Sequence, residues 1–470
     1  MYFLNHLLHQ PKMEVEIMST QYIKPSSPML THPKTHSLSI LDQFFPPIYI
    51  PMVFFYPPDQ STESTLHNGF IQQKLKLLKE SLSQVLNQFY PFAGRIKDNL
   101  SINCNDEGVH YTEAKVSYSL IEFFNQPNFS SCIHKFLPNQ PILEASPEGY
   151  TTMIQVTCFA CGAIVIGTFI SHMIADGAAA SYFLNTWGST TRGEFQHAFE
   201  FPKFDTPFPR NIACPQDSNA TAFCGQFLKK GKLATTRLLF DKEAISKLRV
   251  HGASLIVQNP TRVEVVISLL CKCIAKAFKA NTGLEGPTLV THAVNMRPRA
   301  SPNFPKSYMG NFVWMATALM SSKGNAIDEV LPELVIKLRK VVTAIDSDFV
   351  KGFEDEGGFV KYSEVSKRFY ETGSSVALTS GVNNVHFVSW CNFGLYDVDY
   401  GWGKPIWVSC TPNSSNSEFF NSVILTDTPL GNGIEAWVYL NDDDMTMFQQ
   451  DKELLSFASL EPSPLQLKDH

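Results

Sequence analysis

The sequence predicts a two-domain α/β protein, and three observations carry that prediction. Its 470 residues exceed the size at which one hydrophobic core stops growing, so two domains of roughly 200 residues each are expected. Apolar β-branched runs alternate with helically spaced apolar residues in both halves of the chain. Residues 201–218 are rich in proline and show no periodicity, which is typical of a linker. In such a protein we expect ligand sites at the junction of the domains.

The first domain is expected over residues 21–200, after a flexible extension at residues 1–20. The extension has no basic region and no small-residue cleavage site, so it does not resemble a signal peptide. We expect its removal to leave activity intact, and Met1, Met13 and Met18 stay open as the true start. Strands are expected at residues 48–56, 101–104, 109–113, 153–159 and 163–170, and helices at residues 72–89 and from residue 177 onward.

The second domain is expected over residues 233–470, after a crossover linker at residues 201–232. Thr261 and Glu264 form a capping-box pattern at the start of a long helix. Three aspartates at residues 442–444 precede the closing helix, and we expect them to cap it rather than to bind metal. Strands are expected at residues 233–240, 290–295, 386–390, 406–410, 423–426 and 434–440, and helices at residues 242–249, 261–278, 328–345 and 363–372.

Composition excludes several classes of partner. A net charge of −6 and a pI of about 6.1 argue against nucleic acid or an acidic lipid surface, because both select a basic face. No run of 18 apolar residues is present, so we expect no membrane span. The cysteines are sparse and predict free thiols in a cytoplasmic protein. Cys158 and Cys161 have zinc-pair spacing without a second pair, so packing in the core is the preferred interpretation.

His172 is the first candidate for chemistry. It follows the longest apolar run of the chain, which predicts a strand buried on both faces, and it stands in the turn His-Met-Ile-Ala-Asp-Gly at residues 172–177. Imidazole suits proton abstraction near neutral pH. The spacing from His172 to Asp176 is weak evidence by itself, because a chance match is nearly expected. On spacing alone, a hydrogen-bonded turn with a capping Asp is the preferred interpretation.

A second unusual segment is Asp-Tyr-Gly-Trp-Gly at residues 399–403. Its two glycines permit unusual φ values, and an indole N–H is only a donor, so anchoring of the loop is the simpler interpretation. Asp176 and Asp399 are candidates for ion pairs with Arg297 and Arg299 that tie distant segments together.

Other chemistries find less support. The sequence has neither a Gly-x-Ser-x-Gly elbow nor a glycine-rich phosphate loop. A metal-dependent hydrolase built on His172 and Asp176 lacks a third ligand at recognisable spacing. A cluster of lysines at residues 229, 230 and 232 is a solvated face or a contact for the phosphates of a nucleotide-bearing substrate.

The two segments together, in this order and more than 200 residues apart, resemble the signatures of the plant BAHD acyl-CoA-dependent acyltransferases. Those signatures are an H-x-x-x-D-G turn and a D-F-G-W-G loop, in which Tyr400 replaces the usual Phe. The resemblance covers residues 20–460. Supporting matches lie at residues 38–42, 90–95, 295–299, 309–311 and 433–437.

The resemblance implies two similar α/β domains related to chloramphenicol acetyltransferase, with mixed sheets and an active-site channel at their interface. It makes His172 the general base and Asp176 its structural support, through an ion pair with Arg297. The resemblance also implies supporting roles for five further residues. Trp402 and Gly177 are expected beside the thioester oxygen, while Asp399, Gly401 and Gly403 are expected to build the loop.

Within the family, residues 25–28 and 396–399 are most similar to the branch with vinorine synthase, deacetylvindoline acetyltransferase and salutaridinol acetyltransferase. We therefore expect a monomeric cytoplasmic enzyme without a bound cofactor or metal, which transfers an acetyl group from acetyl-CoA to a hydroxyl of a plant specialised metabolite. The acceptor, the acyl chain and the choice between O- and N-acylation stay open. The alternative is a catalytically silent acyl-CoA-binding protein on the same scaffold.

Overall fold

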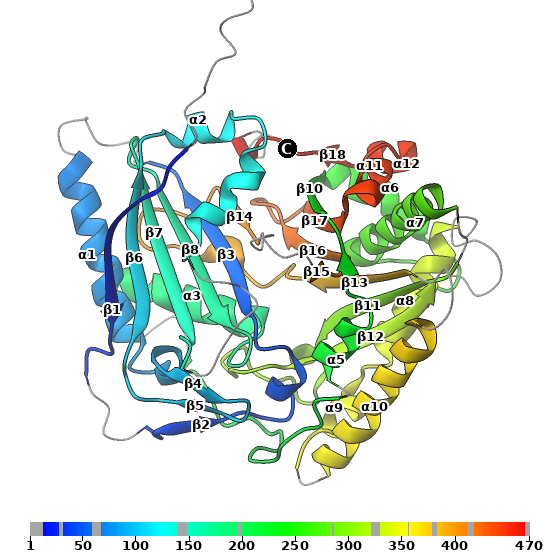
Figure 1. Ribbon diagram of the computed structural model, residues 1–470, viewed down its shortest axis with the longest axis horizontal. Coiled ribbons are helices and arrows are strands. Elements are labelled where there is room, and N and C mark those ends of the chain that lie inside the picture. The colour runs from blue at the N-terminus through cyan, green and yellow to red at the C-terminus, as the bar shows by residue number, and fades with distance from the viewer. Residues whose placement is uncertain are drawn as a thin grey trace, which may run out of the picture.

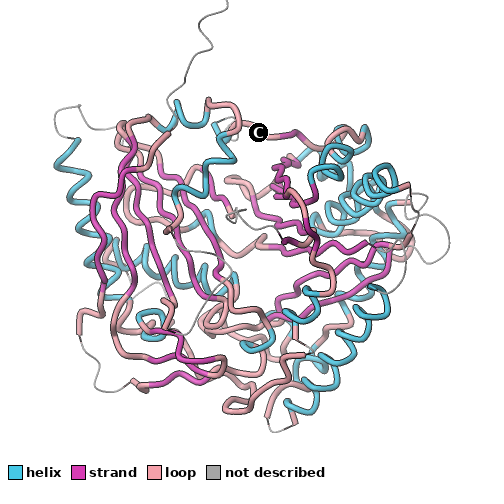
Figure 2. Tube along the Cα trace, viewed as in Figure 1, coloured by secondary structure: helices cyan, strands magenta, loops and turns pink. Residues whose placement is uncertain are grey.

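The computed structural model describes residues 13–465 except 28–31, 59–66, 140–147, 195–199, 218, 284–285, 321–329, 356, 378–382 and 411–417. Two sheets lie side by side, one in each half of the molecule (Figure 1). Helix α1 at the left and helices α7 and α10 at the right lie on the outer sides of the strands (Figure 2). The predicted α/β class and mixed sheets are confirmed.

The first sheet has six strands in the order β1-β6-β7-β8-β3-β14. All eight residues of β3 and of β8 are buried, because the sheet is covered on both faces. β3 and β8 are antiparallel and pair Tyr49 with Ser171 and Tyr56 with Ile164. The bounds are β1 (Glu16–Ile23), β3 (Tyr49–Tyr56), β6 (Val109–Val116), β7 (Thr152–Phe159), β8 (Ile164–Ser171) and β14 (Trp407–Ser409).

Helices α1 (His67–Val85) and α3 (Gly177–Thr191) pack together on this sheet, where the indole N–H of Trp187 donates to the carbonyl of Leu78. A small sheet, β2-β5-β4, lies below it in Figure 1. The remaining elements of this half are β2 (Thr35–Ser37), β4 (Arg95–Asp98), β5 (Ser101–Asn103) and α2 (Leu120–Phe124).

The second sheet has seven strands in the order β12-β11-β13-β16-β17-β10-β18. β13 is parallel to both of its neighbours, whereas the other pairs are antiparallel. The bounds are β10 (Leu233–Phe240), β11 (Thr288–Asn295), β12 (Val313–Met320), β13 (Asn383–Ser389), β16 (Ser422–Asp427), β17 (Ile434–Asn441) and β18 (Ser459–Leu460).

Helix α7 (Arg262–Thr282) is the central cover of the second sheet. It begins with the expected capping box of Thr261 and Glu264 and ends at Gly283 with φ of 68°. The other helices here are α6 (Lys242–Gly252), α8 (Leu331–Thr343), α9 (Ser347–Lys351), α10 (Gly358–Ala377), α11 (Asp442–Phe448) and α12 (Lys452–Leu455).

Three expectations about the chain are wrong in part. Residues 13–20 are not a flexible extension, because β1 pairs with β6 and Met13 is buried in the core; residues 1–12 lie outside the described residues. The crossover at residues 201–232 is not a bare linker, because it contains α5 (Ala220–Gly225) and β9 (Lys229–Lys230), which pairs with β15 (Glu418–Phe419). Asn441 caps α11, while the aspartates at residues 442–444 occupy its first turn.

The division into two domains is less clean than the sequence predicts. β14 lies in the part of the sequence that is expected to form the second domain, but it completes the first sheet by pairing with β3. A buried ion pair in the second half reaches this strand, because Arg237 and Glu435 pair at 3.1 Å and the Trp407 indole donates to Glu435 at 3.0 Å. The two halves are therefore joined by a shared strand as well as by the crossover.

Candidate active site

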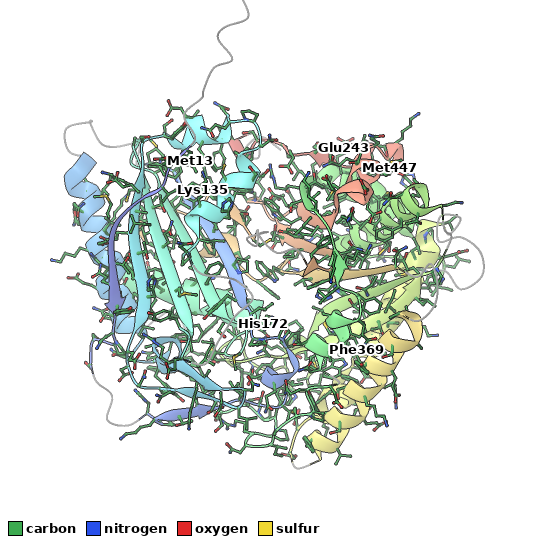
Figure 3. All side chains as sticks on the ribbon, viewed as in Figure 1. Met13, Lys135, His172, Glu243, Phe369 and Met447 are labelled. Atoms are coloured by element: carbon green, nitrogen blue, oxygen red, sulfur yellow. The ribbon has the colours of Figure 1, made fainter. Side chains whose placement is uncertain are left out.

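His172 follows the last residue of β8 and is held through its main chain by both halves. Its N–H donates to the carbonyl of Ile48 at 2.8 Å, and its carbonyl accepts from the side-chain amide of Asn311 at 2.7 Å. Its ring stacks on Phe45, with centroids 4.7 Å apart and 14° between the planes. Figure 3 shows His172 near the middle of the molecule, between the two sheets.

Burial lowers the pKa of His172 below its ordinary value of 6.5, although Asp176, Asn311 and Asp42 oppose that effect. Nδ1 is enclosed and has no hydrogen-bond partner within the described residues, whereas the residue as a whole is only half-buried. The imidazole is therefore neutral near pH 7 and able to accept a proton.

Asp176 caps α3 and also binds Arg297. Its Oδ1 accepts from the N–H of Ala179 at 2.9 Å, and its Oδ2 accepts from Arg297 at 2.6 Å and from the N–H of Phe312 at 3.0 Å. Arg297 also donates to the carbonyl oxygens of residues 308 and 310. The expected ion pair is thus present, and both carboxylate oxygens contact groups of the protein rather than an open cavity.

Asn311 holds the main-chain carbonyl of His172, and Asp42 in turn holds Asn311. The sequence did not predict this role for either residue. One Asp42 oxygen accepts from the N–H and the side-chain amide of Asn311, at 2.8 and 2.9 Å, and the other accepts from Ser39. Burial raises the pKa of Asp42 against these hydrogen bonds. Both residues stand in stretches that carry the family resemblance, residues 38–42 and 309–311, but nothing in those stretches indicates that they meet.

Gly177 is the first residue of α3, where the second half approaches closely. A Cβ at this position would lie 3.0 Å from Nε1 of Trp390 and 3.1 Å from Cε2 of Phe393. Both distances are tighter than ordinary van der Waals contact. The glycine therefore allows the segment after β13 to pack against the turn of His172.

The loop at residues 399–403 is built as expected. The Asp399 carboxylate accepts from the N–H groups of Gly401 and Gly403, at 2.7 and 3.0 Å, and these glycines have φ of 104° and 101°. Arg192 donates to the main-chain carbonyl of Asp399. Tyr400 is buried against Trp187, with ring centroids 4.8 Å apart. Asp399 thus acts through its own loop, and not through an arginine at residue 297 or 299.

The expected place of Trp402 beside the thioester oxygen is wrong. The Trp402 ring packs on Tyr400 and on Tyr56, and Tyr56 is the last residue of β3. His172 lies at the other end of this strand, because its N–H binds the carbonyl of Ile48, the residue before β3 begins. A strand of that length spans about 25 Å. The two family signatures therefore lie at opposite ends of the first sheet, and Trp402 is too far from His172 to contact the reacting atoms.

Several other sequence candidates find structural partners. Arg299 donates to the carbonyls of Val342 and Ile345, and not to Asp399. Two lysines of the basic cluster, residues 229 and 232, pair with the aspartates at residues 444 and 442. Over the described ranges, no group of three His, Cys, Asp or Glu side chains is placed to hold a metal ion.

Comparison with known proteins identifies the family. The model of the Transferase family matches residues 13–455. The chain belongs to this family, the BAHD acyltransferases. The chain is 43% identical over 461 residues to the epi-neemfruitin B 7-O-acetyltransferase of Melia azedarach and 44% identical over 466 residues to the limonoid 7-O-acetyltransferase of Citrus sinensis. Each alignment covers 96% of this chain and 100% of the relative.

Solved structures agree with this assignment. The crystal structure of vinorine synthase superposes with a TM-score of 0.76 at 30% identity, covering 95% of this chain and 99% of that one. TRI101 of F. sporotrichioides, solved with coenzyme A and T-2, shares the fold at 17% identity with a TM-score of 0.68, covering 91% of this chain and 100% of that one. This BAHD enzyme is an acyl-CoA-dependent O-acyltransferase. In the described part of the chain, no helix has the length and apolarity to span a bilayer.

Proposed function

We propose that the enzyme transfers an acetyl group from acetyl-CoA to a ring hydroxyl of a limonoid. The support is the limonoid 7-O-acetyltransferase at 44% identity, together with the epi-neemfruitin B 7-O-acetyltransferase at 43% identity, each aligned over nearly the whole chain. Relatives named for alkaloids are more distant, at 33% for stemmadenine O-acetyltransferase of Catharanthus roseus and 31% for salutaridinol 7-O-acetyltransferase of Papaver somniferum.

In this proposal His172 is the general base. Its neutral imidazole takes the proton of the acceptor hydroxyl at Nε2, and the oxygen attacks the thioester carbonyl carbon. The tetrahedral intermediate then collapses by breaking the C–S bond, and the leaving thiolate takes the proton back from the imidazolium. A placed base contributes roughly 10² to 10⁴ in rate. The single observation that carries the role is that His172 is half-buried and fixed between the two halves by Ile48 and Asn311.

The other site residues position this base. Asp176 and Arg297 join the catalytic turn to the second half, and Asp42 orients Asn311, which holds the carbonyl of His172. Positioning of this kind is valuable because a displacement of about 1 Å at the reacting atoms costs on the order of 10²-fold in rate.

The direct test measures thiol release from acetyl-CoA with a limonoid that bears a free 7-hydroxyl. We expect turnover by the wild-type enzyme and none above background by His172→Ala. His251→Ala is the matched control, because that histidine lies on the exposed face of α6. Near-normal turnover in the His172 variant would refute the assignment of the base.

For Asp176→Asn we expect lower folding stability together with lower activity. The change leaves Arg297 buried without a full counter-charge, and removal of one partner of a buried pair costs about 3 kcal/mol or more. Urea unfolding and turnover are measured on the same preparation. A variant of wild-type stability that loses only turnover would argue that Asp176 takes part in the chemistry.

The proposal also includes a monomer that works in the cytosol. All ten cysteines are free, which suits a reducing compartment. Sedimentation of the purified enzyme at working concentration tests the first point, and a fluorescent fusion in plant cells tests the second.

A further inference from the structure

The second sheet presents a wall to the first half of the molecule. One of its faces packs on α7 through Val385, Phe387 and Val423, which belong to the core of the second half. Because strand residues alternate between the two faces, their neighbours in sequence lie on the other face. Val388 and Ile424 on that face pack against the core of the first half. Several residues of that face stay half-buried although their strands, β11, β13 and β16, are central to the sheet: Ala293, His386, Val388, Ser422 and Ile424.

His386 is a polar side chain of this wall, on strand β13. The parallel registers place it beside Thr291 on one side and Ser422 on the other. Its Nδ1 and the Thr291 hydroxyl form a hydrogen bond of 2.9 Å, and the ring of Phe420 meets its edge at 6.1 Å. The bond to Thr291 fixes the orientation of the imidazole and leaves Nε2 as its second polar atom.

His386 carries no charge at neutral pH. Burial lowers its pKa to about 4, and His292 and His172 act in the same direction. His292 is paired with Phe387, so it lies on the opposite face of the sheet. Strand β13 leads to the turn of His172, because Nε1 of Trp390, just past the end of β13, lies 3.0 Å from the position of an added Cβ on Gly177. His386 stands four residues before that contact, about 13 Å along the strand. A neutral imidazole so held offers a ligand one hydrogen bond and no charge, which suits an uncharged oxygen.

We propose that His386 is a specificity-determining residue that binds a second oxygen atom of the acceptor, so that the preferred acceptor is a polyoxygenated, uncharged alcohol. This proposal rests on the proposed function, because it takes the reacting hydroxyl to lie on His172. A rigid acceptor held there extends toward the wall of β11, β13 and β16. On that wall Ala293, Val388 and Ile424 suit its hydrocarbon, and His386 suits an oxygen.

The test compares Michaelis constants for the two substrates of the wild-type enzyme and three variants, with acetyl-CoA and a limonoid that has a free 7-hydroxyl and further oxygen groups. His386→Phe is expected to raise KM for the limonoid about tenfold and to leave KM for acetyl-CoA unchanged, because one hydrogen bond to the acceptor is lost. His386→Gln retains a hydrogen-bonding group and is expected to recover most of the loss. His251→Phe is the matched control on the exposed face of α6.

Two results for His386→Phe would overturn the proposal. The first is a rise of KM for acetyl-CoA, which would assign the contact of His386 to the pantetheine amides. The second is an unchanged KM for both substrates. If His386→Phe does not fold, Thr291→Val decides, since it keeps the side-chain shape and removes the bond to Nδ1; a smaller rise confined to the limonoid is expected. A wild-type enzyme inactive on the limonoid refutes the proposed acceptor instead. The same comparison then uses the best alcohol of a panel, with and without a second oxygen.

Discussion

Asn311 and Asp42 show how the histidine that we propose as the base is fixed without any contact to its ring. Asn311 binds the carbonyl of His172, and Asp42 uses one carboxylate oxygen to bind Asn311 twice. The ring itself contacts Phe45, which leaves its exposed part available for the acceptor. A position fixed through the main chain restricts the histidine while it leaves the proton chemistry of the imidazole unobstructed.

Tyr400 offers a prediction at the scale of one hydroxyl group. Its OH is buried and has no hydrogen-bond partner within the described residues, whereas the OH of Tyr56 donates to the carbonyl of Val398 at 2.9 Å. We expect Tyr400→Phe to raise the free energy of unfolding by about 1 kcal/mol, because an unsatisfied buried group is removed. The measurement is urea unfolding.

The matched change Tyr56→Phe should act in the opposite direction, with a loss of about 1 kcal/mol, because it removes a bond that is made. Equal effects of the two substitutions would contradict this account and would indicate that the Tyr400 hydroxyl has a partner.

At the scale of elements, helix α3 connects the two family signatures. Asp176 at its N-terminus belongs to the catalytic turn, and Arg192 at its C-terminus binds the loop at residues 399–403. A helix of fifteen residues is about 22 Å long. The loop is therefore linked to the turn of His172 through the length of α3.

Gly188 on α3 tests this connection. A Cβ there would lie 2.6 Å from the carbonyl oxygen of Asp399, a contact with backbone that cannot be relieved by a side-chain rotation. We expect Gly188→Ala to lower the free energy of unfolding by about 2 kcal/mol, since overpacking costs 1–3 kcal/mol. It should also lower kcat.

Gly225 at the end of α5 is the control, because nothing lies within 4 Å of its added Cβ. Gly225→Ala is expected to leave stability and turnover unchanged or slightly raised. If Gly188→Ala is equally harmless, α3 and the loop at residues 399–403 are less tightly packed than described.

Strand β1 makes a prediction about truncation. It covers the edge of β6. Just before β1, the carbonyl of Met13 accepts a hydrogen bond from Lys135 at 2.6 Å, and the two residues lie next to each other in Figure 3. We expect a chain that begins at residue 24 to unfold at lower urea and to aggregate, because β6 becomes an open edge. Static light scattering measures this against a chain that begins at Met13. Equal behaviour of the two would show that β1 is dispensable.

For the whole molecule, the sequence predicted what depends on local pattern. The capping box at Thr261, the runs of β3 and β8 and the turn at His172 are all encoded within a few residues. The sequence did not predict the contact of Asn311 with His172 or the pairing of β14 with β3. Both contacts join segments that are more than a hundred residues apart. Trp402 was misplaced for the same reason: a motif shows that residues belong together, but not at which end of a sheet they lie.

Buried histidines make the whole fold sensitive to acid. Burial lowers the pKa of His36, of His292 and of His386 from 6.5 to about 4. Between these values the unfolded chain binds protons that the folded protein does not, so stability is present above pH 6.5 and is lost as pH falls toward 4. Each histidine contributes a slope of about 1.4 kcal/mol per pH unit.

We expect urea unfolding at pH 5 to show a free energy several kcal/mol lower than at pH 7. His36→Gln should reduce the slope by about one proton, because it removes one of the three groups. A free energy that stays constant between pH 7 and pH 5 would contradict the neutral state of these side chains.

The pairing of β14 with β3 has a consequence for synthesis on the ribosome. β3 emerges early, but its partner at residues 407–409 is among the last strands to be made. At about 5–20 residues per second, the apolar edge of β3 waits on the order of tens of seconds for that partner. A nascent chain in this state presents an open, fully apolar strand. Heterologous production should therefore gain from slower translation or added chaperone, and neither half should be soluble when expressed alone.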